Sequence, residues 1–153
     1  MQLFYLTTTL ALAIGALAAP SHATIIRRDD IVSGNDQKGS IFMFGSEQNC
    51  RQIFWTGGAC GLSTYFADQV DPNLPLIAMP SGVFDRYGQA QHNKLCGKVI
   101  TMTYKGVTKQ AVVADENTSS EQTIDMCLDI WQAFGGVDND GTLRTGITWS
   151  IAA

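Results

Sequence analysis

The sequence has 153 residues, of which 45% are hydrophobic, and its 14 Asp and Glu side chains outnumber 10 Lys and Arg to give a formal charge of −4. No basic stripe is present to neutralise phosphates, which argues against nucleic acid and anionic membrane surfaces as partners. The length allows one domain with a single core, of a size that gains from cross-links.

Residues 1–19 have the pattern of a signal peptide. The segment is uncharged and apolar, and Ala16 and Ala18 give an A-x-A-like cleavage site before Pro20. The apolar run is too short, and has the wrong flanks, for a membrane span. The sequence therefore predicts secretion to the extracellular space.

Residues 20–28 form a short segment that ends in a dibasic pair, Arg27-Arg28, directly before Asp29-Asp30. Cleavage after this pair would remove 20–28 as a propeptide and move the formal charge from −4 to −6, because Lys plus Arg falls from 10 to 8. The alternative is an ordinary exposed basic pair.

Residues 29–49 are rich in Gly, Ser, Asn, Asp and Gln, with one apolar island at 41–44. This composition predicts a flexible N-terminal arm, or a strand loosely attached to the domain that follows.

From residue 50 to residue 153 the chain consists of short apolar runs separated by Gly, Pro, Asn and Asp, which is typical of a compact β-rich domain. Five runs rich in β-branched or aromatic residues are predicted strands: Gln52–Thr56, Leu74–Met79, Gly97–Tyr104, Val107–Ala114 and Gly146–Ala152. The third and fourth are expected to form a hairpin across Lys105-Gly106, since the Gly can adopt a positive φ.

One segment has clear helical spacing. Ile124, Leu128, Trp131 and Phe134 recur three or four residues apart, and a Gly pair follows where a helix cap is expected. Asp125 occupies a natural N-cap position of this predicted helix. A second short helix is expected after Pro80-Ser81.

The four cysteines predict disulfides. Cys50, Cys60, Cys96 and Cys127 are an even set in a chain expected to enter an oxidising compartment, and their spacing lacks any Cys-x-x-Cys pair typical of zinc sites. Two bridges are expected, with three pairings open, and no metal or cofactor is predicted.

Six short motifs follow one another in a familiar order. They are Gly58-Ala59-Cys60-Gly61, Phe84-Asp85, Cys96-Gly97-Lys98, Val112-Val113-Ala114-Asp115, Thr123-Ile124-Asp125-Met126 and Ile147-Thr148-Trp149-Ser150-Ile151. Over residues 51–152 this order resembles the double-psi β-barrel of expansins, barwin-like proteins, family 45 glycoside hydrolases and rare lipoprotein A-like domains. In style the chain is most similar to the single-domain secreted fungal group.

The resemblance implies a mainly β fold: a six-stranded double-psi β-barrel with one or two short helices, cross-linked by disulfides. It also implies the pairing Cys60 with Cys96, which leaves Cys50 with Cys127.

The resemblance assigns roles to two acids. An acid at the Asp125 position is a general acid in the related hydrolases and is needed for wall loosening in expansins, and Asp115 would line the same groove. Read without the family, an Asp at a helix N-cap stabilises the helix by about 1 kcal/mol, and an Asp after a strand is a common turn residue.

Inverting hydrolysis needs a second carboxylate to activate water. In the family 45 enzymes that base stands on the first barrel strand, and the run expected to be that strand, Arg51–Thr56, contains no acid. The sequence therefore predicts no cellulose hydrolysis by that mechanism. Lytic transglycosylase-like activity needs only one acid/base group and stays open.

Other residues complete the predicted groove. Trp55 and Tyr65 could stack on sugar rings, although an aromatic residue in a small barrel is more often part of the core. Asn117 lies in the loop between the two acids and begins the only glycosylation sequon, Asn117-Thr118-Ser119. A glycan there would compete with polysaccharide, and the alternative is an unused sequon.

Two functions follow from this reading. The first is a monomeric, secreted, expansin-like protein that binds or loosens cell-wall polysaccharide without hydrolysis, and the Asp pair favours it. The second is a secreted protein-binding module, such as a cysteine-protease inhibitor or host-directed effector, that uses the barrel to support its loops. The segment Glu116–Ser120, which replaces the expected groove residues, favours the second.

Overall fold

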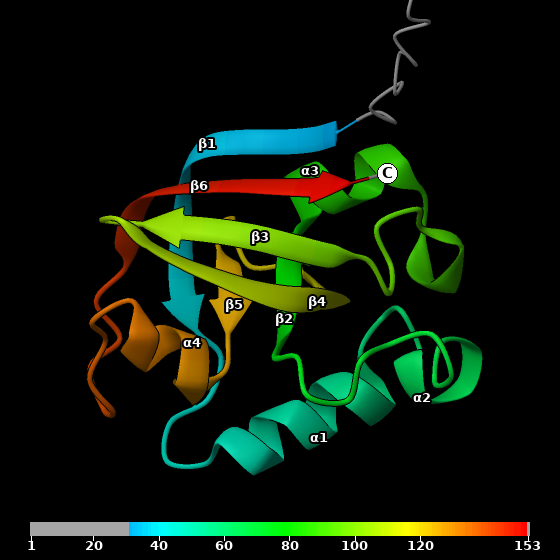
Figure 1. Cartoon of the computed structure of the whole chain (residues 1–153), viewed down its shortest axis with the longest axis horizontal. Coiled ribbons are helices and arrows are strands. Elements are labelled where there is room, and N and C mark those ends of the chain that lie inside the picture. The colour runs from blue at the N-terminus through cyan, green and yellow to red at the C-terminus, as the bar shows by residue number, and fades with distance from the viewer. Residues whose placement is uncertain (1–30, 153) are drawn as a thin grey trace, which may run out of the picture.

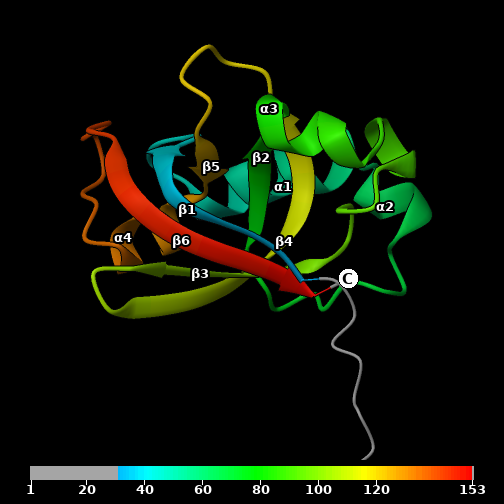
Figure 2. The same cartoon turned by 90° about the horizontal axis from the view of Figure 1, so that it is seen from above.

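The computed structural model describes residues 31–152, so the predicted signal peptide and propeptide lie outside the described residues. Six strands form a closed barrel in the order β1-β5-β2-β4-β3-β6 (Figures 1 and 2). The strands are β1 (Ile31–Ile41), β2 (Leu76–Pro80), β3 (Val99–Tyr104), β4 (Val107–Asn117), β5 (Ile124–Met126) and β6 (Arg144–Ala152). The predicted fold class, a mainly β six-stranded barrel with short helices and disulfides, is confirmed.

The barrel mixes parallel and antiparallel pairs. β1 pairs with β5, and β2 with β4, in parallel, whereas the other four neighbouring pairs are antiparallel. The predicted hairpin is confirmed: β3 and β4 are joined by Lys105 and Gly106, both with positive φ (47° and 82°). Two consecutive positive φ values are those of the tight turn that suits the twist of a hairpin.

Short helices cover the barrel. They are α1 (Glu47–Gly57), α2 (Leu62–Tyr65), α3 (Ser81–Phe84) and α4 (Leu128–Ala133), with two 3-10 turns at Asp85–Tyr87 and Ala90–His92. α3 is the short helix predicted after Pro80. In Figure 1 α1 lies below the strands. Within residues 31–152, no helix has the length and apolar content needed to cross a membrane.

The predicted strand Gln52–Thr56 is wrong, because these residues belong to α1. The helix begins at a side-chain cap, where the Asn49 N–H donates to the Ser46 hydroxyl. Cys50 and Phe54, four residues apart, are both fully buried, which is the spacing of one helix face. Residues 52–56 resemble a strand when they are considered alone. The polar residues before them complete the turns of the helix.

The predicted N-terminal arm is also wrong for most of its length. Residues 31–41 form β1, which closes the barrel between β5 and β6 rather than attaching loosely to it. Two of its positions lie against large core side chains. A Cβ added at Gly34 would lie 2.6 Å from Trp149 Nε1, and one at Gly39 would lie 2.5 Å from Ile147 Cδ1. Because glycines occupy these positions, β1 lacks the apolar alternation by which strands are recognised.

The predicted helix over 124–134 is right only in its second half. Residues 124–126 form β5, and α4 begins at Leu128. Ile124 and Met126 are fully buried and Asp125 is half-buried, the alternation of a strand. Asp125 is therefore a strand residue, and Cys127 stands at the N-cap position of α4.

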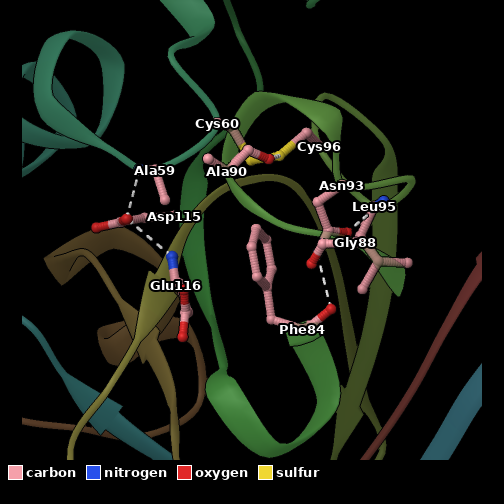
Figure 3. Close-up of a disulfide and its surroundings, with 10 residues drawn as sticks. All are labelled: Ala59, Cys60, Phe84, Gly88, Ala90, Asn93, Leu95, Cys96, Asp115 and Glu116. Atoms are coloured by element: carbon pink, nitrogen blue, oxygen red, sulfur yellow. Dashed lines mark hydrogen bonds between the residues drawn. A yellow bond between two sulfur atoms is a disulfide. The ribbon is translucent and has the colours of Figure 1, made fainter. Parts of the chain in front are cut away.

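Two disulfides fasten the helices and loops to the barrel, and they are the pairs implied by the resemblance. Cys50–Cys127 joins α1 to the residue before α4. Cys60–Cys96 joins the turn after α1 to the segment that leads into β3 (Figure 3).

Candidate functional site

The two predicted site acids lie on one face of the barrel. Asp115 in β4 and Asp125 in β5 both pair with Ala78 of β2, from opposite sides. Directly paired residues in neighbouring strands direct their side chains to the same face of a sheet. The two carboxyl groups therefore flank Ala78, and both are half-buried. We call this surface, with the turn at 57–61, the acid face.

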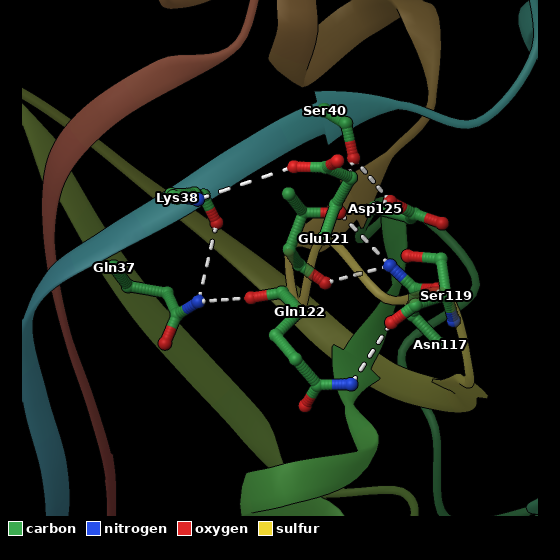
Figure 4. A network of polar contacts seen from close by, with 9 residues as sticks. Gln37, Lys38, Ser40, Asn117, Ser119, Glu121, Gln122 and Asp125 are labelled. Atoms are coloured by element: carbon green, nitrogen blue, oxygen red, sulfur yellow. Dashed lines mark hydrogen bonds and ion pairs between the residues drawn. The ribbon is translucent and has the colours of Figure 1, made fainter.

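Asp125 is held by two hydroxyl groups. Its Oδ1 accepts hydrogen bonds from the Ser40 hydroxyl of β1 (Figure 4) and, at 2.9 Å, from the Thr123 hydroxyl. Burial raises the pKa of Asp125 above its ordinary value, the two hydroxyl donors lower it in part, and the negative charge of Asp115 raises it further. This environment favours the protonated form, as a general acid or a hydrogen-bond donor requires.

Asn117 supports this arrangement from inside the molecule. Its Nδ2 donates to the carbonyl oxygen and to the hydroxyl of Thr123, each at 2.9 Å, and its Oδ1 accepts from the Ser119 N–H at 2.8 Å. The side chain is only 7% exposed. Asn117 therefore reaches Asp125 through Thr123 and does not present its amide at the surface. A glycan on Nδ2 could not share this position.

Asp115 fixes a turn. Its Oδ1 accepts from the Ala59 N–H at 2.7 Å and from the Glu116 N–H at 2.8 Å (Figure 3). The turn packs closely on β4, because a Cβ added at Gly58 would lie 2.5 Å from the Ala114 carbonyl oxygen. The Cys60–Cys96 bridge fastens the next residue of the same turn.

The two predicted aromatic residues are placed differently. Tyr65 in α2 is 55% exposed, and a Cβ added at Gly61 would lie 2.9 Å from its ring, so Tyr65 borders the turn that Asp115 holds. Trp55 is partly buried and lines a separate hollow of about 300 Å³ beside Arg51 and Pro72. Neither Asp115 nor Asp125 lines the hollow beside Trp55.

Residues 51–56 are not the first barrel strand, because they belong to α1. The first barrel strand is β1, and it does contain an acid, Asp36. Asp36 is exposed and lies where the pairing of β1 with β6 is irregular, whereas the β1 residue paired with Asp125 is Ser40. The group beside Asp125 on the first strand is thus a hydroxyl.

Sequence reasoning missed Ser40 and Thr123. Ser40 falls in the polar segment interpreted as an arm, and Thr123 precedes what was predicted as a helix. A buried Thr two residues before an acid, directly before the strand β5, is the one local pattern that indicates the contact. Within residues 31–152, no group of His, Cys, Asp and Glu side chains is arranged to hold a metal ion.

Comparisons with known proteins find similarity among solved structures. No protein-family model matches the chain. No curated protein matches it. Among solved structures, Streptomyces papain inhibitor is similar, with a TM-score of 0.48 and 22% sequence identity, over 80% of this chain and 96% of that one.

Proposed function

We propose that this chain is a secreted protein that binds cell-wall polysaccharide at the acid face without hydrolysing it. The observation that carries the proposal is the shared register of Asp115 and Asp125 on Ala78. Each carboxyl group has Oδ1 fixed by donors from the protein, and neither Oδ2 has a hydrogen-bond partner within residues 31–152. Two oriented polar atoms are thus left for a ligand.

Sugar hydroxyl groups suit these atoms. A carboxylate accepts such hydrogen bonds, and a protonated Asp125 can also donate one to a ring or glycosidic oxygen. Tyr65, exposed beside the turn at 57–61, supplies an aromatic ring on which a sugar can stack.

The absence of hydrolysis is proposed from Ser40. In the hydrolases that the sequence resembles, the first strand supplies the base, and here the first-strand residue paired with Asp125 carries a hydroxyl. A serine hydroxyl is too weak a base to take a proton from water, so it does not replace a carboxylate in that role. Reducing-sugar release from cellulose or chitin should stay at the background rate, and release that is lost in Asp125→Asn would overturn this part of the proposal.

The binding test compares pull-down on chitin, cellulose and peptidoglycan. Asp125→Asn is expected to weaken binding about tenfold, the effect of one charge-assisted or donated hydrogen bond. Asp129→Asn is the matched control, because burial also raises the pKa of Asp129, which lies on α4 away from the acid face. Equal binding by wild type and both variants would remove the acid face from the function.

A second candidate function, a protein-binding module, is favoured by a separate observation. Phe42 and Phe44, in the link between β1 and α1, are 39% and 41% exposed, and exposed aromatic side chains are common anchors of protein interfaces. If the chain binds none of the three glycans but inhibits a papain-type protease, and Phe42→Ala with Phe44→Ala abolishes the inhibition, this candidate replaces the first.

A further inference from the structure

A second polar surface lies on the other side of the barrel from the acid face. It is an open hollow of about 460 Å³ across β1, β6 and β3. In the closed strand order these three strands form one arc, and β5, β2 and β4, which carry the acid face, form the other. Six polar side chains line the hollow: Ser33, Asn35, Thr101, Thr103, Thr148 and Ser150. We call this surface the hydroxyl face.

Strand pairing sets these side chains in rows. Thr103 pairs with Thr148, and Thr101 pairs with Ser150, which pairs in turn with Ser33. Neighbouring strands lie about 4.8 Å apart, a spacing comparable with the length of one sugar ring. The rows face outward, because the residues that alternate with them are buried in the barrel.

The chemistry of the hydroxyl face selects a class of ligand. None of the residues that line it is charged, so it offers nothing to neutralise a phosphate, a carboxylate or an amine. It is not apolar either, since Trp149 is only 5% exposed and its indole lies against Gly34 inside the barrel. Hydroxyl groups both donate and accept hydrogen bonds, which matches a neutral chain that is itself covered with hydroxyl groups.

Much of this hydrogen-bonding capacity is free. Within residues 31–152, the side chains of Ser33, Asn35 and Ser150 have no hydrogen-bond partner in the protein. The Thr103 hydroxyl contacts that of Thr108 at 2.9 Å, and Thr148 makes only a long bond of 3.4 Å to the Thr103 carbonyl oxygen. A ligand can therefore replace water at these groups without breaking the sheet.

We propose that the hydroxyl face is a second binding site, which takes a neutral polysaccharide chain lying across β3, β6 and β1. Its binding does not depend on the acid face. Where both sites are occupied, which rests on the function proposed above, one barrel contacts two chains at once. Simultaneous binding at the acid face and the hydroxyl face would raise the avidity of the protein for cell-wall polysaccharide without any new interaction at either site.

The test uses cellohexaose and chitohexaose, both neutral, with amide resonances followed by NMR. Binding at the hydroxyl face should shift the resonances of residues 33, 101, 103, 148 and 150. The double variant Thr103→Val, Thr148→Val removes two hydroxyls and keeps the β-branched shape, and it should bind about tenfold more weakly at these residues. Thr145→Val, an exposed position of β6 outside the hollow, is the matched control and should bind as wild type does.

The two sites are distinguished by Asp125→Asn. Shifts at the hydroxyl face that persist in this variant support the second site even where the acid face fails. The proposal is overturned if neither oligosaccharide shifts the five resonances, or if the valine pair binds as tightly as Thr145→Val. Thermal melting of each variant checks that the barrel is intact.

Discussion

Among single residues, Asp125 has the most informative environment. It is a half-buried carboxyl group with two hydroxyl donors on one oxygen and a second acid across Ala78. Burial is the largest influence and raises its pKa, so the folded chain holds this proton more tightly than the unfolded chain does. The consequence for stability has a definite sign.

Stability from Asp125 is fully present below the unfolded pKa, close to 3.8, and is lost as the pH rises through the higher folded pKa. Asp125→Asn keeps an oxygen that can accept from Ser40 and Thr123 but does not ionise. We expect the stability of this variant relative to wild type to increase as the pH rises above 3.8 and then to become constant. Urea denaturation at a series of pH values measures the difference.

Asp140→Asn is the control of opposite sign. Hydrogen bonds from Thr142 lower the pKa of Asp140, so its contribution is present above the unfolded pKa and is lost as the pH falls. A stability difference for Asp125→Asn that does not change with pH would contradict the expected environment of Asp125.

Asn117 gives a second prediction for a single side chain. Asn117→Ala removes the partner of the Thr123 carbonyl oxygen and of the Ser119 N–H, and leaving such groups unpaired is expected to cost about 1–3 kcal/mol in the free energy of unfolding. Ser119→Ala also removes the sequon but keeps these bonds, so its stability should equal that of wild type. Intact mass should show no glycan at Asn117, and a glycosylated, stable protein would contradict the burial of this side chain.

Whether a site residue can be predicted from sequence depends on whether its contacts are with residues near it in the chain. Asp115 and Asp125 could be selected because they stand in short motifs whose order resembles a known barrel. Ser40 could not, since it contacts Asp125 across 85 positions of sequence and only the pairing of β1 with β5 brings them together.

Among the helices and strands, sequence pattern predicted the elements whose structure is determined by residues close together in the chain. The β3–β4 hairpin needs only two adjacent strands and a turn with positive φ, and it was predicted. The strand β5 was not predicted, because three residues are too few to show the alternation of a strand. Its buried side chains also follow the helical spacing of the apolar residues in α4, so the two elements together resemble one helix in sequence. The strand β1 was not predicted either, because glycines stand at inward positions where side chains of other strands occupy the space.

That filling can be tested at Gly34. Gly34→Ala puts a methyl group 2.6 Å from the rigid Trp149 ring and should destabilise the protein by about 1–3 kcal/mol. Gly39→Ala meets Ile147 Cδ1 and Met126 Cε, which are the ends of flexible side chains, so its cost should be smaller. Thermal denaturation measures both, and a Gly34→Ala protein as stable as wild type would contradict the packing of Trp149 on β1.

At the scale of the whole molecule, the barrel class was predictable because six motifs occur in one order over most of the chain, which no single motif specifies. The residue at which the domain begins was not predictable, because the composition of β1 is that of a flexible arm. A chain that starts at residue 48 should therefore fail to fold, whereas one that starts at residue 29 should fold, since only the second contains the strand that joins β5 to β6. Dispersed amide resonances from the shorter chain would show that β1 is dispensable.

The position of β1 also constrains biosynthesis. It leaves the ribosome first of the six strands, yet its partners are the last two, so the barrel cannot close until synthesis is nearly complete. Long-range pairing of this kind slows folding and exposes waiting strands to aggregation. Between Val32 and Ile41 this strand consists of Ser, Gly, Asn, Asp, Gln and Lys, and such a polar stretch has a low tendency to aggregate with other nascent chains. The polar composition that makes β1 hard to predict from sequence thus also protects this strand from aggregation until its partner strands have been synthesised.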